Sequence, residues 1–232
     1  MSELTRSLAA EAATGTATKG EPRRLVVLRH GQTVSNAQGI WQGQLDHELS
    51  DLGHQQARAA AVAISSLRPS RVVSSDLSRA HVTAQEVAAA SGDLEVRVDE
   101  RWREIHAGGW QGLTADQVYS QYPQDAEKLI SGEDFKRGGH GESLADVARR
   151  TRQALDGLLA TMDPQECVVI TTHGVTGRCL VAELVGLDQS LAWRVLGGFG
   201  NCHWAVVEEA GTTGTGRSSW RITQWNASAE GV

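Results

Sequence analysis

The sequence has little cysteine and no long apolar run. Cys167, Cys179 and Cys202 are odd in number and include no C-x-x-C pair, which disfavours a disulfide framework, a zinc site and a dithiol redox site. We expect the three side chains to be small, buried hydrophobic groups. No stretch approaches the roughly 20 apolar residues that span a bilayer, and residues 1–22 lack the apolar core of a secretory signal. The sequence therefore predicts a cytoplasmic protein.

An excess of positive charge is also absent. The chain carries 22 lysines and arginines against 28 acidic residues, for a net charge of -6 and a pI of about 5.7. Such a balance gives no general attraction for nucleic acid or an anionic membrane surface, and we expect neither as a partner. H-E-x-x-H, a carboxylate-rich metal motif and a P-loop are missing as well, so we expect no metal and no cofactor. An anionic ligand must then be bound by a local cluster of cations.

What is present indicates one domain. The chain has 232 residues, of which 40% are hydrophobic, enough for a sizeable core. Residues 1–22 show no periodic apolar face and are predicted to form a flexible arm, followed by a single domain over 23–228. Apolar runs at residues 25–28, 71–75 and 167–173 predict buried parallel strands. Two further runs, 201–209 and 218–225, flank a Gly/Thr-rich segment and predict a C-terminal hairpin.

Helices are predicted between these strands. Ser50 is a candidate N-cap for a helix in which Ala59, Ala63 and Leu67 recur on one face. Three more helices are expected over 79–90, over 144–162 behind an S-x-x-D capping pattern, and over 174–186. The alternation of strands and helices predicts an α/β fold, a three-layer α/β/α sandwich around a mostly parallel sheet.

Two His-Gly pairs carry the chemical signal. His30 ends the first apolar strand and His173 ends a later one. In open α/β sheets, ligands bind beyond the carboxyl ends of the strands, where the strand order reverses. If the two strands are neighbours, both imidazoles face one crevice, and Arg29 and Arg79 can join them. Two arginines, two histidines and a helix N-terminus predict a site for a phosphoryl group.

The other chemistry-bearing residues receive simpler interpretations. Six histidines show no ligand spacing and are predicted to be surface or core residues: His47, His54, His81, His106, His140 and His203. Arg149, Arg150 and Arg152 are predicted to form the solvated face of their helix. Trp41 and Trp110 stand beside glycines in loop-like segments and are candidates for lining a pocket.

Several motifs together resemble the histidine phosphatase superfamily, which has the phosphoglycerate mutase-like fold. They are "LRHGQT", "WQGQLDHELSDLGHQQA", "VVSSDLSRAHVTAQ", "REIHAGGWQG", "GGHGESLADVARR" and "VVITTHG". The resemblance implies that His30 is the nucleophile that becomes phosphorylated and that Glu104 is the proton donor. It implies that Arg29, Arg79 and His173 hold the phosphoryl oxygens. It also places Thr33, Asn36, Gln42 and Gly43 where the family shapes phosphate and substrate contacts.

The resemblance further implies an activity. It is that of a phosphomonoesterase working through a phosphohistidine without metal or cofactor. Within the superfamily, "WQGQLD", "GGWQGLT", "GGFGNCHW" and "WNAS" are most similar to the actinobacterial glucosyl-3-phosphoglycerate phosphatases, which implies a small phosphorylated substrate that yields glucosylglycerate.

Three alternatives remain: a broad-specificity acid or sugar phosphatase, a phosphoglycerate mutase, and a non-catalytic phosphoryl-binding protein. "EIHAG" stands where the mutases carry "ERHYG" with a longer following insertion, which favours hydrolysis. Loops such as 111–141 are expected to shape the pocket, and the hydrophobic edge of the C-terminal hairpin is a candidate homodimer surface.

Overall fold

The computed structural model describes residues 21–212 and 218–229. Nearly all of the predicted N-terminal arm, residues 1–20, lies outside them. The described chain forms a six-stranded sheet in the order β3-β2-β4-β1-β5-β6. The strands are β1 (Arg24–Arg29), β2 (Arg71–Ser74), β3 (Val96–Val98), β4 (Cys167–Thr172), β5 (Trp204–Thr212) and β6 (Ser218–Ala227). Strands β3, β2, β4 and β1 pair in parallel, whereas β5 and β6 are antiparallel additions.

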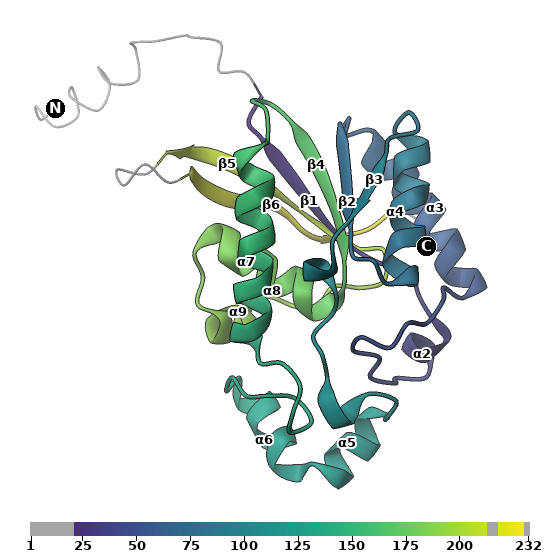
Figure 1. The fold of residues 1–232 in the computed structure, drawn as a ribbon, viewed down its shortest axis with the longest axis vertical. Coiled ribbons are helices and arrows are strands. Elements are labelled where there is room, and N and C mark those ends of the chain that lie inside the picture. The colour runs from purple at the N-terminus through teal and green to yellow at the C-terminus, as the bar shows by residue number, and fades with distance from the viewer. Residues whose placement is uncertain (1–20, 213–217, 230–232) are drawn as a thin grey trace, which may run out of the picture.

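Helices cover both faces of the sheet (Figure 1). On one side lie α3 (Asp51–Ser65) and α4 (Ser78–Ala90), and on the other lie α7 (Leu144–Ala160), α8 (Gly174–Val185) and α9 (Gln189–Val195). The central strands β1 and β4 are therefore buried on both faces, which explains their continuous apolar sequences. Val26 and Leu28 pack toward α3 and α4, whereas Leu25 and Val27 pack toward α7 and α8. The predicted α/β/α sandwich is confirmed.

The topology places a switch point between β1 and β4. These strands are neighbours, with Arg29 opposite Thr172. After β1 the chain runs to α3 on one face, and after β4 it enters α8 on the other. The two connections thus leave in opposite directions and open a crevice at the carboxyl ends of the two strands. His30 and His173, the residues that follow these strands, lie at this crevice.

The local signals in the sequence match the observed helix ends. Ser50 caps α3 by accepting a hydrogen bond from the Gly53 N–H, and Ser143 forms a capping box with Asp146 at the start of α7. Helix α8 ends at Val185 and is capped by Gly186, which has the left-handed conformation that favours glycine.

The predicted face of α3 lies at the margin of the face that packs on the core, where Ala63 and Leu67 contact the buried cluster. The side facing the core carries Ala57, Ala60, Ala61 and Ile64. Ala59 and Ala63 are half-buried, and the helix ends before Leu67. A run of alanines lets several stripes fit the helical period, and only packing against the sheet selects one of them.

Two small helices form a separate cluster beyond one end of the sheet (Figure 1). They are α5 (Ala115–Gln121) and α6 (Pro123–Ser131), within a segment that the sequence suggested only as loop. Trp110, Val118 and Phe135 form the core of this cluster. The remaining elements are α2 (Val34–Ala37) and the 3-10 turns η1 (Glu100–Trp102) and η2 (Gly108–Trp110). None of the helices in the described ranges is both long and apolar enough to cross a bilayer.

Candidate active site

The two histidines that follow β1 and β4 lie against each other. Their ring centroids are 5.0 Å apart and the ring planes meet at 61°. The side chains are almost completely buried, at 3% exposure for His30 and 0% for His173. Parallel pairing of β1 with β4 brings together residues 143 positions apart in the chain.

His30 is held in one tautomer by its own main chain. Its Nδ1 lies 2.7 Å from the carbonyl oxygen of Gly31. A carbonyl can only accept, so Nδ1 carries the proton and Nε2 keeps its lone pair. Burial, together with the charges of Arg79 and Arg29, holds the pKa of His30 well below its usual value. The ring is therefore neutral at pH 7, with a nucleophilic nitrogen at Nε2.

Gly31 must be a glycine for a steric reason. A Cβ at this position would lie 2.4 Å from the carbonyl oxygen of Gly53, in the first turn of α3. The Gly31 N–H donates to the Thr83 hydroxyl on α4. The glycine after the histidine thus lets the loop pack directly on two helices, and this packing holds the His30 ring in place.

His173 is oriented by a serine at the end of a third strand. Its Nε2 is 2.9 Å from Ser75 Oγ, and its Nδ1 is buried without a hydrogen-bond partner among the described residues. If the serine hydroxyl donates to Nε2, Nδ1–H is left as a donor for a ligand oxygen. Burial, followed by the charge of Arg79, lowers the pKa of His173 well below its usual value.

Acidification is expected to destabilise the fold through these two imidazoles. The folded protein keeps both neutral because their pKa values are depressed, whereas the unfolded chain protonates histidine near pH 6.5. The stabilisation is therefore present above pH 6.5 and is lost as the pH falls below it. From pH 7.5 to 5.5 each histidine contributes a loss of about 1.4 kcal/mol. Urea titrations at both pH values measure the loss of unfolding free energy on acidification. This loss should be about 1.4 kcal/mol smaller for His173→Gln than for the wild type. Equal losses would contradict a neutral His173 in the folded protein.

Two arginines flank the histidines, Arg79 buried and Arg29 half-buried. Arg79 donates from Nη2 to the Gly43 carbonyl and from Nη1 to the Leu45 carbonyl, each over 2.8 Å. Arg29 donates from Nη1 to the Phe199 carbonyl over 2.6 Å. The Nε atoms of both arginines are buried without a hydrogen-bond partner in the described chain. Burial lowers the pKa of Arg79 to about 10, so its guanidinium is still cationic at neutral pH.

Glu104 rests on the N-terminus of α8. Its Oε1 accepts hydrogen bonds from the N–H groups of Ile105 and Thr176 and from the Thr176 hydroxyl. Its Oε2 accepts one, from the Val175 N–H. A Cβ placed on Gly174 would lie 3.7 Å both from Glu104 Oε2 and from Arg29 Nε, so this glycine stands between the carboxyl group and the arginine. Oε2 keeps the freer lone pair.

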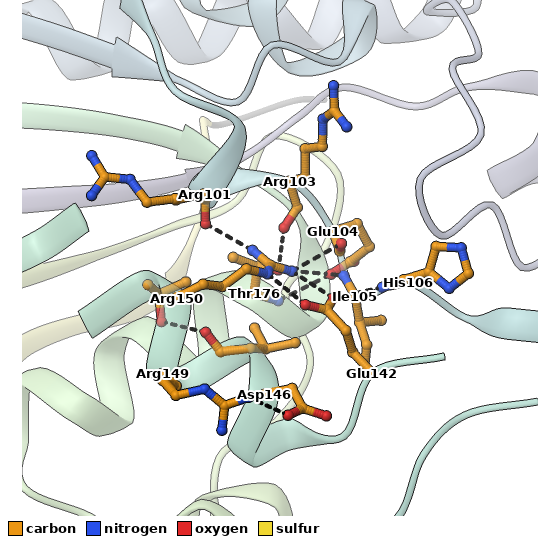
Figure 2. A network of polar contacts seen from close by, with 12 residues as sticks. Arg101, Arg103, Glu104, Ile105, His106, Glu142, Asp146, Arg149, Arg150 and Thr176 are labelled. Atoms are coloured by element: carbon orange, nitrogen blue, oxygen red, sulfur yellow. Dashed lines mark hydrogen bonds and ion pairs between the residues drawn. The ribbon is translucent and has the colours of Figure 1, made fainter. Parts of the chain in front are cut away.

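A salt-bridged arginine holds the main chain that carries Glu104 (Figure 2). Arg150 on α7 donates to both carboxylate oxygens of Glu142 and, from Nη2, to the Glu104 carbonyl over 3.0 Å. Glu142 also accepts the His106 N–H. The prediction that Arg149, Arg150 and Arg152 share a solvated face is wrong for Arg150, whose side chain is 17% exposed. Helical periodicity could not identify its partners, because they come from another segment.

The four remaining site candidates form one connected turn. Thr33 is the N-cap of α2 and exchanges hydrogen bonds with Asn36 in a capping box, and its hydroxyl lies 3.0 Å from Gln42 Oε1. Asn36, Gln42 and Gly43 line the cavity beside His30. Thr33 is completely buried and is not among the lining residues. Gly43 has a φ of +54°, and its carbonyl orients Arg79.

One cavity of about 260 Å³ is lined by Arg29, His30, Asn36, Gln42, Gly43, Arg79, Glu104 and Gly174. His173 packs against the His30 ring and is not among the lining residues. The further walls of the cavity are mostly apolar or main-chain: Gly39, Ile40, Trp41, Ile105, Val175, Gly198 and Phe199, with Arg178 as a third arginine. Trp41 lines the cavity as expected, whereas Trp110 is fully buried and supports Trp41 edge-on over 5.0 Å. No residue of the 111–141 segment is in this lining. The expected influence of this segment on the pocket is therefore indirect. For example, Gln111 Oε1 accepts a hydrogen bond from the N–H of Gln44, next to the lining residue Gly43.

Sequence reasoning missed Ser75 and Arg178. Ser75 could have been found by the rule that identified the two histidines, because it is a polar residue at the carboxyl end of an apolar strand. Arg178 lies four residues after Gly174, on the same face of α8, and that spacing was its signal. The Phe199 carbonyl had none, because main-chain groups leave no mark in a sequence. In the described part of the chain, no group of three His, Cys, Asp or Glu side chains is placed to hold a metal ion.

Comparison with known proteins gives consistent results. A family model described as "Histidine phosphatase superfamily (branch 1)" matches residues 25–227. The chain is 43% identical over 218 residues to "Glucosyl-3-phosphoglycerate phosphatase" of Mycobacterium tuberculosis, covering 90% of this chain and 96% of that protein. It is 32% identical to "Phosphoserine phosphatase 1" of Hydrogenobacter thermophilus, covering 79% of this chain and 85% of the relative.

A solved structure has a similar fold over almost the same length of chain. The structure of mycobacterial glucosyl-3-phosphoglycerate phosphatase in complex with VO3 has a TM-score of 0.81 and 41% sequence identity to this chain. The match covers 89% of this chain and 100% of the solved one. The similarity thus extends over nearly the whole described domain, including the crevice between β1 and β4.

Proposed function

This chain belongs to the histidine phosphatase superfamily, and from that premise we propose that it is a metal-independent phosphomonoesterase that uses His30 as nucleophile and acts on glucosyl-3-phosphoglycerate. One observation carries the proposal. A buried, neutral imidazole has its Nδ1 proton tied to the Gly31 carbonyl, so its Nε2 is presented among arginine donors, in the cavity that Glu104 also lines.

In the first step, the His30 Nε2 lone pair attacks phosphorus in line with the ester bond. The P–N bond forms as the P–O bond to the alcohol breaks. Arg29, Arg79 and His173 Nδ1–H stabilise the charge on the three nonbridging oxygens, which is the main electrostatic demand of phosphoryl transfer. Glu104 donates a proton from Oε2 to the departing alkoxide.

In the second step, water cleaves the phosphohistidine. Glu104, now a carboxylate, accepts a proton from the water as the water oxygen attacks phosphorus. The P–N bond breaks and its electron pair returns to His30 Nε2. The sum of the two steps is ester plus water giving alcohol plus phosphate. The N–H groups of Ile105, Val175 and Thr176 hold the carboxyl group in one place for both steps.

The substrate assignment rests on similarity to the mycobacterial enzyme together with the cavity walls. A phosphorylated glucosylglycerate carries a phosphoryl group, a carboxylate and a sugar. Trp41 offers aromatic surface next to the cationic end of the cavity, which suits a sugar ring beside a phosphate. The cytoplasmic location stays a prediction. So does a homodimer through the outer edge of β6.

A substrate panel tests this function and its alternatives. Glucosyl-3-phosphoglycerate, mannosyl-3-phosphoglycerate, 3-phosphoglycerate and an aryl phosphate are compared by phosphate release, with and without EDTA. We expect kcat/KM to be highest for the glucosyl compound by at least about tenfold, the scale of a few extra pocket contacts, and to be unaffected by EDTA. Similar values on all four would indicate a broad-specificity phosphatase. Formation of 2-phosphoglycerate from 3-phosphoglycerate faster than free phosphate would indicate a mutase.

A further inference from the structure

The third arginine of the cavity has no role in the steps above. Arg178 lies on α8, and its guanidinium carbon is 4.2 Å from the centre of the Trp193 ring. It donates from Nη1 to the Trp193 carbonyl over 3.3 Å. Stacking and this hydrogen bond fix the plane of the guanidinium and occupy one edge of it. The opposite edge, formed by Nε and Nη2, is left for another partner.

That edge binds carboxylates elsewhere in the same chain. Arg71, Arg103 and Arg150 each use Nε together with Nη2 to hold Glu166, Asp76 and Glu142, respectively. Arg178 is in none of the ion pairs of the described residues, and its Nε is buried there without a hydrogen-bond partner. A half-buried cation with an open two-donor edge, one atom of which is fully buried, calls for a planar anion.

The surroundings place this edge at the substrate. Arg178 lines the same cavity as His30 and Glu104. It follows Gly174 by one helical turn, about 6 Å along the axis, and helical side chains lean toward the N-terminus, here toward the crevice. A Cβ on Gly198 would lie 3.2 Å from Arg178 Nη2, while the next carbonyl, that of Phe199, holds Arg29. One short segment therefore abuts both the arginine at the phosphoryl site and Arg178.

Charge distinguishes the site of Arg29 and Arg79 from that of Arg178. Arg29 and Arg79 together match a phosphoryl group that carries two negative charges. Arg178, a single cation with a planar pair of donors, matches a carboxylate. A three-carbon acid with phosphate at one end and carboxylate at the other spans a distance on the scale of one helical turn. We propose that Arg178 binds the substrate carboxylate and so selects phosphorylated hydroxy acids over phosphomonoesters that lack a carboxylate; this rests on the proposed function of the same site.

Kinetics on a matched substrate pair test the proposal. 3-Phosphoglycerate and glycerol 3-phosphate differ in having a carboxylate or a hydroxymethyl group at the end opposite the phosphate. We expect the wild type to prefer the acid, and Arg178→Gln to reduce the ratio of the two kcat/KM values about 10- to 100-fold, mainly through KM for the acid. Arg178→Lys, which keeps the charge and loses the fork, should restore part of the preference.

The control variant is Arg58→Gln, which removes the same charge from the exposed surface of α3 and should leave the ratio unchanged. Equal losses by Arg178→Gln on both substrates would assign Arg178 a structural role and overturn the proposal. An unchanged ratio, or a wild type without preference for the acid, would also overturn it.

A further measurement separates this proposal from the proposed function. A wild type that releases phosphate neither from glucosyl-3-phosphoglycerate nor from these two compounds would overturn the phosphatase assignment. Titration calorimetry then tests the carboxylate site by measuring the affinity of His30→Ala for both compounds, with and without the additional substitution Arg178→Gln. Tighter binding of 3-phosphoglycerate than of glycerol 3-phosphate that disappears with Arg178→Gln supports the site, and equal binding of both compounds overturns it.

Discussion

Replacing His30 by alanine is expected to reduce turnover by about four to six orders of magnitude, because no other group in the mechanism can take the phosphoryl group. The ring is buried and neutral, its Nδ1 is bound to the Gly31 carbonyl, and Nε2 is its only nucleophilic atom. Initial rates of phosphate release measure the loss. Acid-labile, base-stable label from a 32P-phosphorylated substrate should appear on the wild type and not on the variant.

The matched control is His140→Ala, at an exposed histidine outside the active-site cavity, which should retain the activity and the label. A cooperative urea transition in His30→Ala would show that the fold survives the substitution. Retention of more than a few per cent of the activity, or an undiminished label on the variant, would reject His30 as the nucleophile.

Replacing Glu104 by glutamine is expected to produce the second largest loss, and one that depends on the leaving group. Glutamine can keep its side-chain oxygen on the N-terminus of α8 but cannot transfer a proton. Hydrolysis of a sugar-acid phosphate, whose alkoxide must be protonated, should fall about 10²- to 10⁴-fold. Transfer from an aryl phosphate, whose phenolate leaves unaided, should fall much less, and stopped-flow traces should show a burst of phenol because water attack on phosphohistidine also lacks its base.

The control for this variant is Glu100→Gln, an exposed carboxylate in the neighbouring turn η1. It should show normal rates on both substrates and no burst. If Glu104→Gln slowed the aryl and the alkyl esters equally, the carboxyl group would be holding the main chain or the substrate, and the proton donor would have to be sought elsewhere.

The secondary structure could largely be predicted because its signals are local. Ser50 and Ser143 cap helices through atoms three residues away, and the apolar runs of β1 and β4 reflect burial on both faces. Strand β3 and helices α2, α5, α6 and α9 were not predicted. The three residues of β3 are too few for a period to show, and α5 and α6 depend on a small core around Trp110 that assembles from separate segments.

The site residues, too, could be predicted only where a local signal marks them. The strand-end rule led to His30 and His173, and the family motifs led to Glu104. The partners that orient them could not be read from the chain: the Phe199 carbonyl for Arg29, Ser75 for His173 and Arg150 for the Glu104 segment. These contacts join residues that are 46 to 170 positions apart, and no local pattern encodes such a pairing.

The sequence by itself determined which residues bear the chemistry and at which ends of which strands they stand, because strands and caps are set by neighbours within a few positions. The tertiary structure decided what those residues can do. Parallel pairing of β1 with β4 brings two imidazoles within 5.0 Å, and burial with two arginines keeps them neutral. The tertiary structure also directs Arg150 to the carboxylate of Glu142 and leaves the Nε and Nη2 edge of Arg178 open in the cavity. Distance and desolvation arise only when remote segments pack, so they are properties of the fold.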